Sequence, residues 1–191
     1  GPESAQRKIV SVEELRPALD RLRSAGRRIV FTNGCFDLLH AGHVEMLSFA
    51  RAQGDTLVVA VNSDRSVRLI KGNGRPIYPA AERALILAAL EMVDYVVVFD
   101  ETRARRVVSA IHPDVLVKGE DWRDKTVDGQ AFVESHGGRV VLAPLLPGYG
   151  TTLTIERLRT TAARGTGAEL ALKGRPAKPR DKVAHRALKL R

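Results

Sequence analysis

The chain has 191 residues, 44% of them hydrophobic and 5% aromatic, and a formal net charge of +9. This length suits one domain with a full core, and no apolar run approaches the ~20 residues of a membrane-spanning helix. Cys35 is the only cysteine, so the composition also argues against a disulfide-stabilised scaffold. We expect a cytoplasmic protein without a signal peptide.

The positive charge is concentrated at the end of the chain. Residues 164–191 contain nine lysine and arginine residues and two acidic ones, so they carry +7 and leave +2 for the rest. No apolar period survives there, and we expect a basic, disordered tail. The predicted domain covers residues 9–163. Residues 1–8 are expected to form an N-terminal extension, in which Gly1 and Pro2 are typical of a tag-cleavage scar.

Helical and strand patterns alternate along the domain. Ser11 and Glu14 form a capping-box pattern ahead of the first helix, which ends at Gly26. Continuous β-branched runs such as 56–61 are typical of strands buried on both faces of a parallel sheet. The predicted strands are 28–31, 56–61, 95–99, 115–117 and 139–143. The predicted helices that follow the first one are 41–53, 63–71, 79–92, 103–111, 127–135 (or a looser segment) and one ending near 163. This alternation predicts a single Rossmann-like, doubly wound α/β domain, a five-stranded parallel sheet with helices on both faces.

The most informative stretch is Thr32–His43, which follows the first strand. It contains a glycine turn and then His40-Ala41-Gly42-His43 at the start of a helix. Histidines three residues apart lie on the same side of the first turn, where free N–H groups and the helix dipole attract anions. An imidazole near its pKa can donate to a phosphate oxygen and carry positive charge. The pattern predicts a nucleoside-triphosphate site in which His40 and His43 are catalytic.

Other polar groups follow the remaining strands, at the edge where open α/β sheets bind ligands. Lys71 and Arg75 lie around a turn-rich loop, Lys118 ends the fourth strand, and Thr151-Thr152 opens the last helix. Such a pocket offers many anion donors and no obvious base or nucleophile. This combination fits nucleotidyl transfer, in which a substrate phosphate attacks the α-phosphorus of a nucleoside triphosphate and pyrophosphate leaves.

Two further residues near the motifs have simpler interpretations. Cys35 follows the first strand and is interpreted as a small packing residue rather than a nucleophile. Arg83 lies on the 79–92 helix, and the sequence leaves open whether it binds an anion or is a helix-surface charge.

Several motifs occur together in the order found in cytidylyltransferase-like nucleotidyltransferases. They are Thr32–His43, Val61–Asp64, Arg75–Ile77, Val93–Tyr95, Leu116–Gly119 and Thr151–Thr152. Over residues 9–163 the chain resembles the D-glycero-D-manno-heptose 1-phosphate adenylyltransferase family. The resemblance implies an enzyme that transfers AMP from ATP to a sugar 1-phosphate, giving ADP-heptose for lipopolysaccharide and pyrophosphate, normally with Mg²⁺. It also implies a separate sugar kinase as pathway partner, leaves homo-oligomerisation open and makes nucleic-acid binding unexpected.

The resemblance also implies roles for individual residues. The catalytic residues would be His40, His43 and Lys71. ATP would be bound by Thr32, Asn33, Gly34, Phe36, His40, His43, Lys118, Gly119, Asp121, Tyr149, Thr151 and Thr152. The sugar phosphate would be bound by Asn62, Asp64, Lys71 and Arg75. No residue is assigned to a metal.

Two alternatives remain open at this point. The glycerol-3-phosphate cytidylyltransferase branch shares the His-x-Gly-His motif and the Asp121-Trp122 pair. That branch carries an arginine where this chain has Leu145 and another near Glu91-Met92, so the missing cations favour the adenylyltransferase. The other alternative is a polyanion-binding protein that acts through its basic tail. The tail lacks interleaved aromatic residues for base stacking, and deleting residues 164–191 would separate the two functions.

Overall fold

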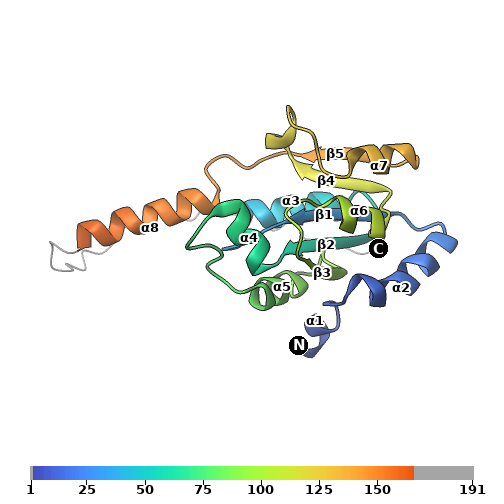
Figure 1. Ribbon diagram of the computed structural model, residues 1–191, viewed down its shortest axis with the longest axis horizontal. Helices are drawn as coiled ribbons and strands as arrows, with labels where there is room; N and C mark the ends of the chain where they lie inside the picture. The colour runs from blue at the N-terminus through green and yellow to red at the C-terminus, as the bar shows by residue number, and fades with distance from the viewer. Residues whose placement is uncertain (1, 166–191) are drawn as a thin grey trace, which may run out of the picture. The chain divides into compact units, whose positions relative to one another are not determined.

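The computed structural model describes residues 2–165 and contains one open sheet whose paired strands are all parallel (Figure 1). The order across the sheet is β3-β2-β1-β4-β5. The strands are β1 (Ile29–Gly34), β2 (Thr56–Asn62), β3 (Tyr95–Phe99), β4 (Val115–Gly119) and β5 (Arg139–Ala143). The predicted five-stranded parallel sheet is therefore confirmed, and the bounds of β3 and β5 coincide with the predicted ranges.

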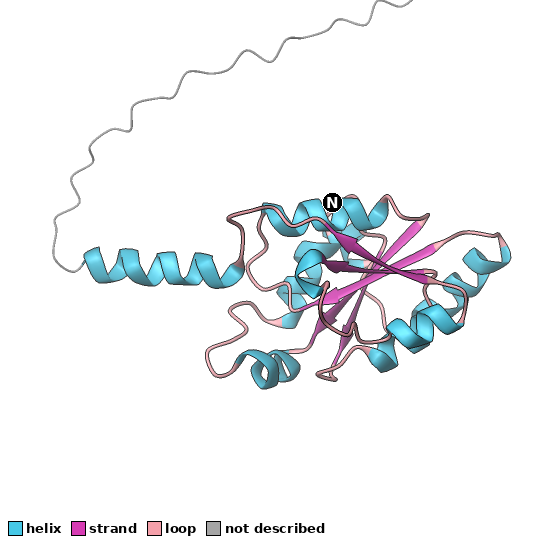
Figure 2. Cartoon of the chain, turned by 90° about the horizontal axis from the view of Figure 1, so that it is seen from above, coloured by secondary structure: helices cyan, strands magenta, loops and turns pink. Residues whose placement is uncertain are grey.

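Helices cover both faces of the sheet (Figure 2). On one face α1, α3 and α5 contribute buried apolar residues, among them Leu47 and Leu87. On the other face α2, α6 and α7 do so, among them Leu15 and Val108. The helices are α1 (Pro2–Gln6), α2 (Val12–Ser24), α3 (Ala41–Arg51), α4 (Asp64–Lys71), α5 (Ala80–Ala88), α6 (Arg105–Ile111), α7 (Gln130–Ser135) and α8 (Thr151–Gly165), with a 3₁₀ turn η1 (Glu120–Trp122).

Local sequence explains the strongest of these elements. Every residue of β2 is buried, as its unbroken β-branched run predicts for a central parallel strand. At the start of α2 the capping box is present: the Ser11 N–H donates to Glu14 Oε2 at 2.7 Å, and the Glu14 N–H donates to Ser11 Oγ at 3.1 Å. These two bonds satisfy backbone donors that the helix itself cannot pair.

The N-terminal extension departs from the sequence prediction. Residues 2–6 form α1, and Ala5 is buried in the core instead of lying outside the domain. Lys8 Nζ donates to the carbonyl oxygens of Leu90 and Val93 at 3.2 and 2.7 Å. Residues 2–8 therefore pack on the end of α5, a tertiary contact that no local pattern predicts.

The chain divides into two compact units, residues 1–155 and 156–191. The first unit contains the whole sheet. Helix α8 begins in it at Thr151 and continues to Gly165, past the predicted boundary at 163. From residue 166 on, the predicted basic tail lies outside the described residues. No helix within residues 2–165 is long and apolar enough to cross a membrane.

The strand order determines where loops separate at the edge of the sheet. The chain leaves β1 for β2 on one side and later returns to place β4 on the other side of β1. The loops after β1 and β4 therefore run in opposite directions, which opens a crevice at their carboxyl ends. The His-x-Gly-His turn follows β1 and η1 follows β4, so both predicted motifs lie at this crevice.

Candidate nucleotide site

A cavity of about 380 Å³ lies at the carboxyl ends of β1 and β4. It is bounded by the turn after β1, the end of α4, η1 and the start of α8. The sequence-predicted residues that it brings together are Thr32, Asn33, Gly34, Phe36, His43, Asn62, Lys71, Arg75, Lys118, Gly119, Asp121 and Thr151. These residues come from distant parts of the chain.

The geometry of His43 leaves one ring nitrogen free to bind a ligand. Its Nδ1 accepts a hydrogen bond from the His40 backbone N–H at 3.3 Å. This bond assigns the proton of the neutral ring to Nε2, which then acts as a donor. Burial, helped by the nearby His40, lowers the pKa of His43 to about 4. In the absence of a ligand His43 is therefore a neutral donor at pH 7, which corrects the expectation of an imidazole near its pKa.

His40 lies against His43 instead of lining the cavity wall itself. The two rings stack with centroids 3.9 Å apart, and Tyr149 lies on His40 at 6.0 Å. Burial lowers the pKa of His40. A Cβ on Gly42 would lie 3.0 Å from the His40 ring and 3.2 Å from Tyr149 Cβ, so glycine lets the His40 ring pack closely over the helix start.

Three buried side-chain atoms within the described residues have no hydrogen-bond partner. They are Thr32 Oγ1, Asn33 Oδ1 and His40 Nδ1, and all three belong to residues predicted for the site. Buried polar groups are nearly always paired, and an orphan group costs roughly 1–3 kcal/mol. Thr32 and Asn33 line the cavity itself, so a ligand there could complete their hydrogen bonds.

Lys118 supplies a buried cation between the two loops. It is 7% exposed, and its Nζ donates to the Asn33 carbonyl at 3.1 Å. The ammonium also lies 5.0 Å from the centre of the Trp122 ring. Burial lowers the pKa of Lys118 to about 8, while Asp128 and Asp121 oppose that shift. Lys118 is therefore mainly charged at pH 7, and ammonium protons remain for an anion.

Asp37 connects three loops around the cavity. It lies within the Thr32–His43 stretch, but no role of its own was predicted for it from the sequence. Its carboxylate accepts from Arg75 Nε at 2.8 Å and from the N–H groups of Ile77 and Tyr78 at 2.7 and 3.0 Å. Its carbonyl accepts from Thr151 Oγ1 at 2.8 Å. Burial alone would raise the pKa of Asp37, but these donors outweigh burial and the pKa is lowered.

The consequences for the neighbouring basic and hydroxyl residues are specific. Arg75 reaches the cavity while paired with Asp37, so part of its charge is already neutralised. Lys71 ends α4 at the cavity, and no described side chain forms an ion pair with it. The hydroxyl of Thr151 is engaged, whereas the backbone N–H groups at the start of α8 are the type that binds anions.

The predicted site residues that the cavity does not contact are His40, Asp64, Tyr149 and Thr152. Asp64 departs most clearly from its expected role. Its Oδ1 accepts from Arg83 Nη2 at 2.9 Å and from the Ala80 N–H at 2.8 Å. Arg83 is fully buried and also donates to the carbonyls of Tyr78 and Cys35. The helix-surface interpretation of Arg83 is therefore wrong, and the pair holds the loops that surround the cavity.

Asn62 and Cys35 both line the cavity. The Asn62 amide is already hydrogen-bonded within the protein, and the Cys35 thiol is a poor nucleophile. Asn62 Nδ2 donates to Ser66 Oγ at 2.9 Å. Burial raises the pKa of the Cys35 thiol despite the nearby cations, and a raised pKa disfavours the nucleophilic thiolate. The raised pKa agrees with a packing role for Cys35.

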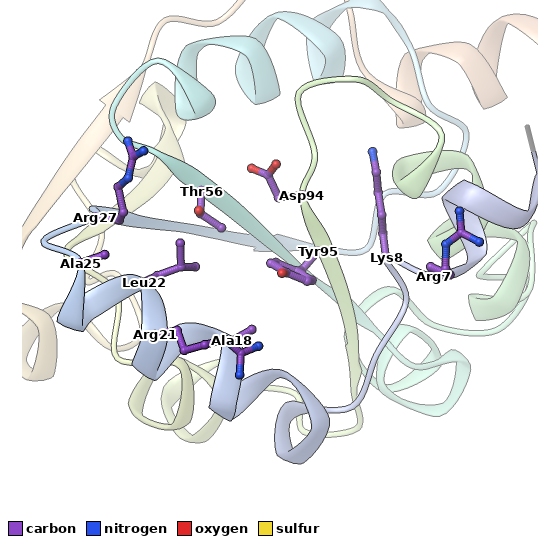
Figure 3. Close-up of a pocket in the computed structure, with 10 residues that line it drawn as sticks. All are labelled: Arg7, Lys8, Ala18, Arg21, Leu22, Ala25, Arg27, Thr56, Asp94 and Tyr95. Carbon is purple, nitrogen blue, oxygen red and sulfur yellow. The ribbon is translucent and has the colours of Figure 1, made fainter.

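A larger cavity of about 550 Å³ lies at the opposite, amino-terminal edge of the sheet (Figure 3). It is lined by Arg7, Lys8, Ala18, Arg21, Leu22, Ala25, Arg27, Thr56, Asp94 and Tyr95. Lys8 already donates to two backbone carbonyls, and Arg27 already donates to Asp55. None of the unpartnered buried atoms of the described chain lies there. The carboxyl-edge cavity is therefore the stronger candidate site in spite of its smaller volume.

A parallel sheet with the His-x-Gly-His turn at its switch point places the chain in the Rossmann-like α/β class. Comparison with known families is more specific: residues 31–148 match the model of the Cytidylyltransferase-like family. The chain belongs to that family.

Curated relatives extend the comparison over most of the domain. The chain is 55% identical over 156 residues to the "Bifunctional protein HldE" of Acidiphilium cryptum, covering 82% of this chain and 32% of the relative. It is 49% identical over 158 residues to the protein of the same name from Alkalilimnicola ehrlichii, covering 83% and 33%. The chain thus spans about a third of the length of these relatives.

Solved structures show a similar fold. A lipopolysaccharide core biosynthesis protein from Thermoplasma volcanium is 28% identical with a TM-score of 0.51, covering 63% of this chain and 98% of that one. A pantoate-beta-alanine ligase from Francisella tularensis has a TM-score of 0.56 over 82% of this chain and 75% of that one. Its identity is 14%, so this second likeness concerns the fold alone.

Proposed function

We propose that the protein transfers AMP from ATP to D-glycero-D-manno-heptose 1-phosphate, forming ADP-heptose and pyrophosphate. The observation that carries the proposal is the cavity at the β1–β4 crevice, where His43, Lys118 and the orphaned atoms of Thr32 and Asn33 converge. Membership of the Cytidylyltransferase-like family and the similarity to bifunctional proteins support it. The similar lipopolysaccharide core biosynthesis protein supports a role for the product in that glycan.

The reaction needs positioning and charge stabilisation more than proton transfer. A phosphomonoester is already anionic near neutral pH, so its oxygen can attack the α-phosphorus without a general base. His43 would donate from Nε2 to the triphosphate, and Lys118 would offset negative charge on the reacting phosphates. Lys71 and Arg75 also line the cavity and would hold the sugar phosphate.

Mg²⁺ would enter with the triphosphate. Within residues 2–165, His, Cys, Asp and Glu side chains form no group of three or more that could hold a metal ion. Mg²⁺ is commonly bound by one or two carboxylates together with substrate phosphates, and Asp121 offers one carboxylate at the cavity. When bound, Mg²⁺ would offset charge on the phosphates. We also propose that a sugar kinase activity, on a separate chain or domain, supplies the heptose 1-phosphate in the cytoplasm.

Pyrophosphate release with paired substrates tests the function. ATP and CTP are each combined with heptose 1-phosphate and with glycerol 3-phosphate. Leu145 packs near Gly119 at the cavity and offers no donor to a cytosine carbonyl, which would lose a partner on binding. We expect ATP to exceed CTP by at least about tenfold in kcat/KM, equivalent to ~1.4 kcal/mol. A preference for CTP and glycerol 3-phosphate would instead assign the protein to the cytidylyltransferase branch.

Replacing Lys71 by alanine separates the two substrates. Because Lys71 lies beside Arg75 at the cavity and has no ion-pair partner among the described side chains, its loss should weaken sugar-phosphate binding. We expect the KM for the sugar phosphate to rise about tenfold, with a smaller change in the KM for ATP. Arg68→Ala is the matched control, because Arg68 is an exposed residue of the same helix outside this cavity. Equal increases in both KM values would reject the assignment.

A further inference from the structure

One wall of the candidate cavity carries acidic and hydroxyl groups. Thr102 and Asp128 line it together with Trp122. Trp122 packs on the core that α2, α6 and α7 cover, whereas Met46, near His43, packs on the opposite core. The cavity therefore has a histidine side and an acidic side, on the two faces of the sheet.

The backbone around Asp128 is held firmly by its neighbours. Val127 is 3% exposed and belongs to the core. Gly129 has φ +86°, and a Cβ there would lie 2.6 Å from a methyl carbon of Val108. The buried Val127 and the close approach of Gly129 to α6 hold the backbone on both sides of Asp128.

The Asp128 carboxylate retains capacity to accept hydrogen bonds. Its neighbours Arg103 and Arg105 both approach Oδ1 at 3.9 Å, and their side chains are 71% and 68% exposed. No hydrogen bond from a described residue reaches the carboxylate. Long, exposed ion pairs of this type contribute little energy, so the oxygens remain available to a ligand.

A carboxylate in an anion-binding cavity repels phosphate, and its natural ligand there is a hydroxyl donor. The Trp122 ring adds an apolar face beside Lys118. Acceptor oxygens beside an aromatic face and an ammonium suit a polyhydroxylated chain that carries a phosphate.

We propose that Asp128 recognises hydroxyl groups of the sugar phosphate and thereby selects a polyol acceptor. This inference rests on the proposed function and deepens it. It assigns the sugar phosphate to the acidic side of the cavity and the triphosphate to the histidine side. Asp128 acts as a binding residue and contributes to the affinity for the sugar phosphate.

The test compares Asp128→Asn and Asp128→Ala with Asp124→Asn, an exposed aspartate in the same segment outside the cavity. Pyrophosphate release gives KM values for heptose 1-phosphate and for ATP. We expect both Asp128 variants to raise the KM for heptose 1-phosphate about tenfold or more, with less than about a twofold change for ATP. Asp124→Asn should leave both values unchanged. Asparagine has nearly the same shape as aspartate, and thermal denaturation verifies that each variant is folded.

The possible outcomes separate this inference from the function on which it rests. If the unchanged protein releases no pyrophosphate with any sugar phosphate, the proposed function is overturned and the inference with it. If the unchanged protein is active and folded Asp128→Asn keeps both KM values, only the inference fails. A rise in the KM for ATP alone would place Asp128 at the nucleotide ribose and would also overturn the inference.

Discussion

Replacing His43 by alanine should lower kcat by about a hundredfold to a thousandfold, because one preorganised donor to a developing anion contributes ~2.7–4 kcal/mol. The Nδ1 of His43 is already engaged by the His40 N–H, so Nε2 has no other role in the described structure than to meet a ligand. The fold should survive, since the ring contributes only that backbone bond, stacking on His40 and a tilted contact with Phe36.

The pH profile provides a second readout for His43. Its lowered pKa, about 4, keeps the ring neutral at pH 6 and above in the ligand-free protein. His43 should therefore keep the same charge as pH rises from 6 to 8, and substrate binding should not weaken through it. A histidine with an ordinary pKa of ~6.5 would lose its charge over this range and weaken binding. His136→Ala is the control, an exposed histidine outside the cavity. A folded His43→Ala variant with nearly unchanged kcat would remove His43 from the mechanism.

The elements that the sequence predicted best are those whose burial follows from local pattern. Strand β2 is buried along its whole length, and its β-branched run predicted this. Helix α5 was predicted to reach Met92 but ends at Ala88. Its apolar pattern continues, yet the carbonyls of Leu90 and Val93 bind Lys8, a contact from the other end of the domain. A tertiary contact of this kind cannot be predicted from the local helical pattern.

The same distinction applies to the candidate site. The His-x-Gly-His turn was identifiable because its spacing and its place after a strand imply an anion site. The sequence left the role of Arg83 open and assigned Asp64 to the sugar phosphate, because an arginine on a helix reveals its burial only when distant carbonyls and a carboxylate meet it. Asp128 likewise has no motif around it. Its place at the cavity depends on Val127 and Gly129 packing against α6.

Removing the buried carboxylate of Asp37 should lower both stability and activity, which together form the largest effect that we predict. Asp37→Ala should destabilise the protein by about 3–5 kcal/mol, the usual cost of breaking a buried ion pair by removing one partner. The side chain is 0% exposed, and its removal leaves Arg75 and the N–H groups of Ile77 and Tyr78 without their acceptor. The loop that carries Arg75 would lose its anchor, so activity should fall by more than about a hundredfold even where the variant is folded.

Measuring the free energy of unfolding at different pH values tests whether the charge of Asp37 is the source of its stabilising effect. Because the folded-state pKa of Asp37 is lowered, its stabilisation is complete above the ordinary carboxyl pKa of ~3.9 and is lost as pH falls through the lower folded value. Urea unfolding should therefore show the full deficit of Asp37→Asn at pH 7 and a shrinking deficit only below about pH 4. Asp100→Asn is the matched control: its ion pair with Arg65 is 61% exposed on the aspartate side, so the loss of stability should be small. An Asp37→Asn deficit no larger than that of Asp100→Asn would show that the Asp37 carboxylate does not hold these loops together.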